Sequence, residues 1–128
     1  MKTIEKAFFK CSICGNLVGL VADGGVPMEC CGQPMKKLTA NTQDASLEKH
    51  VPVAEIKDDL LTVNIGAAAH PMVAEHYIQW ILVTQGNRTQ RVELTAGDAP
   101  TAEFCAEEDG EIIVYAYCNL HGLWKTVI

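Results

Sequence analysis

Short runs of alternating or continuous apolar residues, separated by polar turns, recur through most of the chain after residue 50. Turn signals such as Gln85-Gly86-Asn87 and Glu108-Asp109-Gly110 separate them, and no segment keeps a sustained helical period. This spacing predicts an antiparallel, immunoglobulin-like β-sandwich. The expected strands are His50–Ile56, Leu60–Ile65, Tyr77–Val83, Thr89–Leu94, Ala102–Cys105 and Glu111–Tyr117, and the one expected helical turn is Val73–His76.

The first part of the chain has a different pattern. It offers a short strand at Ala7–Lys10, an apolar run at Leu17–Val21 and two turns that contain cysteines. A unit this small buries too little apolar surface to fold alone, so a metal is expected to hold it together. The polar stretch 37–49 places a linker near Leu38–Ala45. The sequence therefore predicts an all-β protein with two domains, residues 1–37 and 38–128.

Composition and charge limit the classes of partner. The chain is 48% hydrophobic and 20% charged, which is typical of a globular protein. Residues 1–40 carry a net charge of +2 and residues 41–128 a net charge of −8, which argues against nucleic-acid binding. With no signal peptide and no apolar stretch near the ~18 residues of a membrane span, the chain is expected to be cytoplasmic and not to bind a membrane. Six cysteines in a cytoplasmic protein indicate metal or redox chemistry rather than disulfides.

The first candidate metal site consists of Cys11, Cys14, Cys30 and Cys31. Two turns supply four thiolates, the donor set of a tetrahedral site for zinc, iron or an iron–sulfur cluster. Spacing alone leaves open whether this is an iron site or a zinc ribbon that only supports folding.

The second candidate site draws on every histidine of the chain, His50, His70, His76 and His121, together with Cys118. Each lies beside a predicted strand end or turn. Four imidazoles and one thiolate are too many for a closed zinc site but suit iron with a sixth position open. Such a centre carries about one positive charge in its ferrous form and attracts a small anion in an acidic domain.

At this point the sequence closely resembles the desulfoferrodoxins, the two-iron class of superoxide reductases. The resemblance covers essentially the whole chain. It implies a desulforedoxin-like first domain with one iron on four cysteines, a catalytic second domain with one iron on four histidines and a cysteine, and a homodimer. The motifs that carry it are the two candidate ligand sets with Glu48-Lys49-His50-Val51-Pro52, His70-Pro71-Met72, Gly97-Asp98-Ala99-Pro100, Ala102-Glu103-Phe104-Cys105 and Cys118-Asn119-Leu120-His121-Gly122.

The resemblance also implies an activity and roles for two further residues. Superoxide is reduced by one electron to hydrogen peroxide, and an external donor such as rubredoxin, or the four-cysteine iron, restores the ferrous site. Lys49 corresponds to the lysine that guides the anion, and Glu48 to the glutamate that can cap ferric iron. The alternatives are an electron-transfer protein with a saturated second site and a zinc-dependent structural module.

Two residue types outside these sets receive plainer interpretations. Cys105 is expected to be a buried strand thiol, because free cysteine behaves as a small hydrophobe. The aromatic residues Trp80, Tyr115, Tyr117 and Trp124 are expected in the core or in pocket walls.

Overall fold

The computed structural model describes residues 3–42, 50–66 and 70–128. Two compact units make up the chain, one formed by Glu5–Thr39 and the other by the rest of the described chain. The predicted boundary between residues 37 and 38 stays a prediction. Over the described ranges, no helix is long and apolar enough to cross a membrane.

The small unit is built from five very short strands. Strand β1 (Phe8–Lys10) lies between β2 (Leu17–Gly19) and β5 (Lys36–Lys37), and β3 (Glu29–Cys30) pairs with β4 (Gln33–Pro34). Phe8 is buried, and a Cβ on Gly19, which is its partner across the strands, would come within 3.3 Å of its ring. The unit thus has a very small apolar core, as its length predicts.

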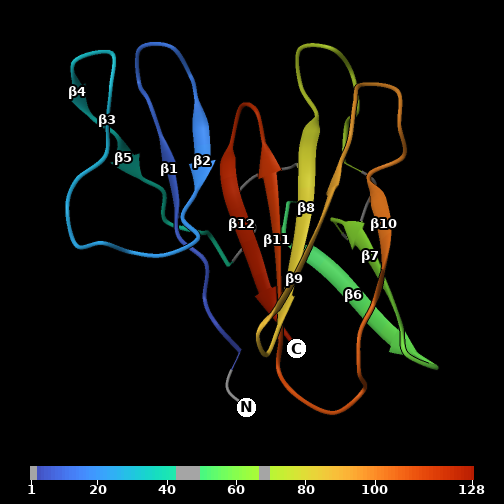
Figure 1. Ribbon diagram of the computed structural model, residues 1–128. Helices are drawn as coiled ribbons and strands as arrows, with labels where there is room; N and C mark the ends of the chain where they lie inside the picture. The colour runs from blue at the N-terminus through green and yellow to red at the C-terminus, as the bar shows by residue number, and fades with distance from the viewer. Residues whose placement is uncertain (1–2, 43–49, 67–69) are drawn as a thin grey trace. The chain divides into compact units, whose positions relative to one another are not determined.

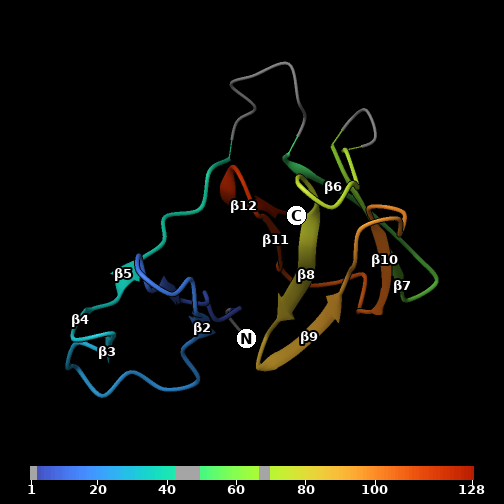
Figure 2. The ribbon, with the colours of Figure 1, turned by 90° about the horizontal axis from the view of Figure 1, so that it is seen from above.

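Seven strands of the larger unit form two antiparallel sheets (Figure 1). One sheet has the order β10-β7-β6 and the other β12-β11-β8-β9, and Figure 2 shows the two sheets facing each other. The first, second and fifth strands of the unit share one sheet, as in an immunoglobulin-like sandwich. The bounds are β6 (Pro52–Lys57), β7 (Leu60–Ile65), β8 (Ile78–Gln85), β9 (Arg88–Glu93), β10 (Thr101–Cys105), β11 (Ile112–Cys118) and β12 (Gly122–Val127).

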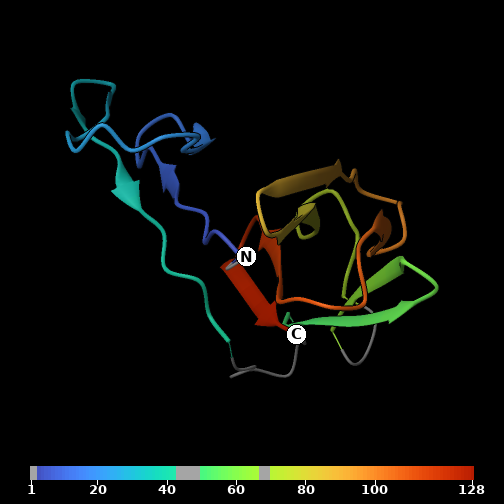
Figure 3. The same ribbon diagram turned by 60° about the horizontal axis from the view of Figure 1, so that its bottom comes forward.

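The core lies between these two sheets, whose strands Figure 3 shows from another side. Strand β7 contributes alternate residues, as expected for a strand with one buried face, whereas β11 is buried at every position. The predicted all-β sandwich is confirmed. The fully packed cluster includes Leu61, Val63, Ile65, Ile78, Ile81, Val83, Phe104, Ile112, Val114, Ala116 and Cys118.

Tight turns connect neighbouring strands where the sequence signals them. Asp58 and Asp59 join β6 to β7 with φ values of 53° and 62°, so both central residues are left-handed, as in a type I′ hairpin turn. Aspartate tolerates this conformation better than most residues. Gly86-Asn87 joins β8 to β9 in the same two-residue manner.

Two sequence expectations are wrong, and one strand was not predicted. The unpredicted strand is β12, Gly122–Val127, which begins within the metal motif. Val73–His76 is not a helical turn, because Val73 and His76 exchange two backbone hydrogen bonds of 3.0 Å as an antiparallel bridge. Cys105 is exposed rather than buried, since β10 points Ala102 and Phe104 inward and its odd-numbered residues outward.

Candidate metal centres

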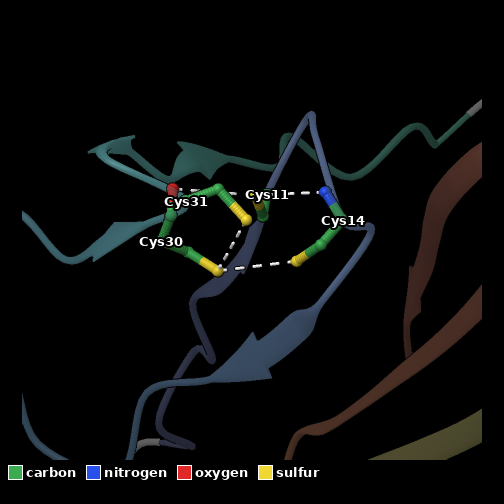
Figure 4. A group of neighbouring side chains, drawn as sticks. All are labelled: Cys11, Cys14, Cys30 and Cys31. Carbon is green, nitrogen blue, oxygen red and sulfur yellow. Dashed lines mark hydrogen bonds between the residues drawn. The ribbon is translucent and has the colours of Figure 1, made fainter.

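The four cysteines of the small unit converge from two turns (Figure 4). Cys11 and Cys14 lie in the turn after β1, while Cys30 ends β3 and Cys31 follows it. All four sulfurs lie within 4.8 Å of one another, with Cys14 Sγ 3.5 Å and Cys31 Sγ 3.9 Å from Cys30 Sγ. Thiolates around one tetrahedral ion lie roughly 3.8 Å apart when each metal–sulfur bond is about 2.3 Å. The predicted four-cysteine set therefore fits a single metal ion.

Backbone groups surround these sulfurs. The N–H of Cys14 donates to Cys11 Sγ at 3.5 Å, and the N–H of Asn16 donates to Cys14 Sγ at 3.4 Å. The chain can turn tightly enough because Gly15 and Gly32 have φ values of 81° and 76°. Cys31 shares the left-handed conformation, with a φ of 54°, which aims its side chain back toward Cys30.

The thiols of Cys11 and Cys31 have different pKa values. Backbone N–H groups, first that of Cys14 and then that of Ile13, lower the pKa of Cys11 to about 6. Neighbouring thiols, Cys14 foremost, raise the pKa of Cys31 to about 12. Without a cation, four sulfurs this close cannot all be thiolates, because their charges repel. A metal ion supplies the positive charge that lets all four ionise.

The second cluster forms at one end of the sandwich. His50 precedes β6, whose first residue pairs with the last residue of β7, so this histidine lies where the chain leaves β7 toward His70. Likewise His76 precedes β8, whose first residue Ile78 pairs with Cys118 at the end of β11. His121 follows in the turn between β11 and β12. Antiparallel pairing thus brings ligands from distant parts of the sequence to the same edge.

The four imidazole rings stand at the corners of a near-square. Neighbouring ring centroids are 4.7 Å apart for His50–His70, 4.7 Å for His70–His76, 5.0 Å for His76–His121 and 4.8 Å for His50–His121. The diagonal from His50 to His76 is 6.3 Å. Four rings arranged in this way can direct one nitrogen each toward a single ion.

Individual donor atoms also fit one ion. His50 Nε2 lies 3.1 Å from His121 Nδ1, and two nitrogens bound cis to one metal at about 2.1 Å lie roughly 3.0 Å apart. Cys118 Sγ is 3.8 Å from the same His121 nitrogen. His70 directs Nδ1 to the carbonyl of Pro71 at 2.7 Å, so Nε2 is the nitrogen it can offer to a metal.

The ligand atoms of His70 are less tightly grouped than those of the other four predicted ligands. Ligand atoms of His50, His76, Cys118 and His121 all lie within 4.8 Å of one another. His70 joins this group through its ring contacts with His50 and His76. The structure thus brings all five predicted residues together, four of them tightly.

Burial gives this site an inner and an outer side. His50, His70 and Cys118 are buried, at 1%, 3% and 0% exposure, whereas His76 is half-buried and His121 is exposed. Among the described residues, the solvent-exposed side of the site is therefore that of His76 and His121. The other predicted site residues, Glu48 and Lys49, lie outside the described residues.

Trp124 is a supporting residue whose role the sequence did not reveal. Its indole stacks on His50 with centroids 4.6 Å apart and an interplanar angle of 12°. The same indole donates its Nε1–H to the carbonyl of His121 at 3.1 Å. The prediction of a core or pocket-wall residue holds, since Trp124 is buried, but the side chain also orients two predicted ligands. The motif Cys118-x₂-His121 followed by tryptophan was the available signal.

The chain is similar to proteins of one known family. The desulfoferrodoxin profile matches residues 42–127, and the profile of the desulfoferrodoxin N-terminal domain matches residues 3–38. The chain is 45% identical over 118 residues to a desulfoferrodoxin homolog of Archaeoglobus fulgidus, covering 92% of this chain and 94% of that one. It is 44% identical over 117 residues to the desulfoferrodoxin of Nitratidesulfovibrio vulgaris, covering 91% and 92%.

Solved structures agree with the sequence matches. The superoxide reductase of Treponema pallidum superposes with a TM-score of 0.79 at 31% identity, over 95% of this chain and 98% of that one. A one-iron superoxide reductase of Giardia intestinalis matches with a TM-score of 0.58 at 29% identity, over 63% of this chain and 97% of that one. With both family profiles matched in order and both cysteine and histidine clusters in place, the chain belongs to the desulfoferrodoxin family.

Proposed function

We infer that this protein is a superoxide reductase. The observation that carries the proposal is the near-square of four imidazoles beside the Cys118 thiol, in a chain of the desulfoferrodoxin family. The overall reaction combines one superoxide, one electron and two protons to give one hydrogen peroxide. When bound there, iron supplies the one-electron couple that this reaction requires.

The protein's own residues define what such a site can do. Imidazoles and a thiolate suit iron in preference to hard cations, and five donors leave one position of an octahedral ion for a small ligand. The buried residues His50 and Cys118 close the inner side, so exchange is directed to the side of His76 and His121. In the first cluster, Cys11, Cys14, Cys30 and Cys31 would hold the first iron of the family.

Lys49 and Glu48 are proposed as the catalytic side chains near the second iron. This proposal rests on the motif Glu48-Lys49-His50, because both residues directly precede the buried predicted ligand His50 in the sequence. The Lys49 ammonium would draw the superoxide anion toward the iron and stabilise charge that develops on peroxide. Glu48 would cap the ferric site after turnover.

Partners beyond the substrate also belong to the proposal. A rubredoxin-like one-electron donor returns the iron to the ferrous state, and two copies of the chain form a homodimer. The acidic second part, with a net charge of −8 over residues 41–128, supports the absence of nucleic-acid binding. Cysteine usage without predicted disulfides supports a cytoplasmic location.

The activity is tested by metal analysis and superoxide kinetics on the purified chain. We expect two irons per chain and, with a reductant present, superoxide consumption yielding one hydrogen peroxide per superoxide, measured by pulse radiolysis and peroxide assay. If the iron at the histidine site is reversibly oxidised and reduced but does not react with superoxide, the chain is an electron-transfer protein instead. A colourless zinc protein would contradict both.

Charge substitution tests the proposed role of Lys49. Lys49→Ala should slow the bimolecular reaction with superoxide and flatten its dependence on ionic strength, because an attractive charge near the target is lost. Lys57→Ala is the matched control, since Lys57 ends β6 and therefore lies far along the strand from His50. Equal rates and equal salt dependence in Lys49→Ala and Lys57→Ala would remove Lys49 from the mechanism.

A further inference from the structure

The exposed side of the histidine site depends on two turns that come from different parts of the chain. One turn, residues 73–76, carries His76 and connects to β8 through Tyr77. The other, residues 119–121, carries His121 between β11 and β12. The first turn is held only weakly by packing, because Val73, Ala74 and Glu75 are exposed. Something else has to hold His76 at a fixed distance from His121.

Asn119 connects these two turns through three hydrogen bonds. Its Oδ1 accepts from the N–H of Tyr77 at 2.9 Å, and its Nδ2 donates to the carbonyl of Glu75 at 3.0 Å. Its own backbone N–H donates to the carbonyl of Tyr77 at 3.2 Å. One side chain therefore fixes the residue before His76 and the residue after it, from the segment that links Cys118 to His121.

The strand register explains how Asn119 reaches this place. Tyr117 pairs with Trp80 but Cys118 pairs with Ile78, so β8 contains an extra residue at this point. This bulge advances β8 by one residue against β11 and brings Tyr77 opposite Asn119. Bulges of this kind often re-aim side chains beside functional sites.

We propose that Asn119 is a positioning residue for the catalytic iron, because its carboxamide sets the spacing between His76 and the Cys118–His121 pair. This inference rests on the superoxide reductase function proposed above. The relevant spacing is the His76–His121 edge of the near-square, at 5.0 Å the longest of its four edges. Both histidines lie on the more exposed side of the site, so a shift of either one changes the shape of that side.

The size of the effect follows from the behaviour of residues that support metal ligands. Removing such a supporting group typically costs about 10- to 100-fold in metal affinity. Productive geometry tolerates displacements of only about 0.5 Å. We therefore expect Asn119→Ala to hold iron at the histidine site about 10- to 100-fold more weakly than the natural chain, without affecting the four-cysteine iron.

The experiment uses the full chain loaded with iron at both sites. Iron retention is measured by competition with a chelator, and the four-cysteine absorption serves as the internal reference for folded protein. Asn119→Asp has the same size and keeps the acceptor for Tyr77, but it places a carboxylate oxygen against the carbonyl of Glu75. We expect its retention to fall between those of the natural chain and Asn119→Ala. The matched control is Asn87→Ala, because Asn87 lies exposed in the turn between β8 and β9.

A second readout separates positioning from general stability. At saturating iron, the ferric absorption and electron paramagnetic resonance spectra of the histidine site should differ from those of the natural chain in both Asn119 variants. In Asn87→Ala these spectra should be the same as those of the natural chain. Natural retention and natural spectra in Asn119→Ala would overturn the proposal. If Asn119→Ala does not fold, the same result in Asn119→Asp overturns it.

The controls also distinguish this inference from the function on which it rests. If the natural chain binds no iron at the histidines or consumes no superoxide, the proposed function fails. If the natural chain is fully active and the Asn119 variants match it in retention and spectra, only the positioning role fails.

Discussion

At the level of single residues, the two clusters differ in what surrounds their donor atoms. The cysteine sulfurs receive backbone N–H groups from their own turns, such as that of Cys14 on Cys11. The histidines are held by side chains from elsewhere, as His50 is by the Trp124 indole. A site built from local backbone needs little more than its turns, whereas the histidine site needs the folded sandwich.

This difference explains which site residues could be predicted. Cysteines and histidines have few structural roles at turns, so their number and spacing indicated both ligand sets. Asn119 directly after β11 and Trp124 within β12 are ordinary residues at such positions. Their support of the site depends on Tyr77 and His50, which lie 42 and 74 residues away in the sequence. The bulge in β8 that creates the Asn119 contacts leaves no sign in the hydrophobic pattern.

Asp98 offers a test of a pH-dependent contribution by one side chain. Its carboxylate accepts from the backbone N–H of Thr95 at 2.8 Å and from the Thr95 hydroxyl at 3.0 Å, and these bonds lower its pKa below 3.8. Because the bonds favour the charged form, their stabilisation is present above pH 3.8 and is lost as the pH falls through the lowered pKa. The same turn contacts the segment after His70, since the N–H of Gly97 donates to the carbonyl of Met72 at 2.8 Å.

We therefore expect Asp98→Ala to unfold at a lower temperature than the natural chain near neutral pH. The difference should shrink as the pH falls from 3.8 through the lowered pKa, because the natural carboxylate becomes protonated over that range. Thermal unfolding followed by circular dichroism across this range checks it. Asp98→Asn, which keeps an acceptor without the charge, should differ from the natural chain less than Asp98→Ala does. A difference that stays constant with pH would contradict the role of the charge.

At the level of elements, the chain signals its turns more clearly than its shortest strands. The two-residue turn at Gly86-Asn87 was evident, because Gly86, with a φ of 58°, has a backbone conformation that few other residues accept. The two-residue strands β3, β4 and β5 were not, since so short a segment has no period. The pairing of Val73 with His76 likewise depends on contacts rather than on pattern.

The turn at Cys31-Gly32 provides a prediction at this scale. Both residues are left-handed, and Gly32 has a φ of 76° with open space around a Cβ. Gly32→Ala therefore introduces backbone strain without a steric clash, at a cost of about 1–2 kcal/mol. We expect the four-cysteine absorption to be lost at a lower temperature or chelator concentration.

Gly24→Ala is the matched control for this strain. Gly24 also has open space around a Cβ, but its φ lies outside the left-handed region. Its substitution should leave the four-cysteine site as stable as in the natural chain. Equal loss of absorption in Gly24→Ala and Gly32→Ala would show that the turn conformation is not what stabilises the site.

For the whole molecule, the negative charge of the second part of the chain opposes the approach of an anionic substrate to the catalytic site. Residues 41–128 have a net charge of −8, yet the proposed substrate is an anion. Distant carboxylates are screened beyond about 8 Å at physiological ionic strength, so charges close to the site decide the approach. The iron and the proposed Lys49 would supply the local positive field, which is why the salt dependence of the rate is informative.

The division into two units makes a final prediction about how the two irons depend on each other. The four cysteines all belong to Glu5–Thr39, and the histidine cluster belongs wholly to the other unit. A unit of this small size depends on its metal for folding, whereas the sandwich has a large apolar core of its own. Cys14→Ala should therefore remove the four-cysteine absorption and leave the histidine iron in place. His76→Ala should do the reverse.

Metal analysis combined with absorption spectroscopy measures both outcomes on the same samples. Each variant should lose one iron per chain, and only the spectrum of the altered site should disappear. The His76→Ala sandwich should stay folded, because its core residues come from β7, β8, β10 and β11 and not from the turn that carries His76. Loss of both irons in either variant would mean that the units do not fold and bind metal independently, and that one site requires the other.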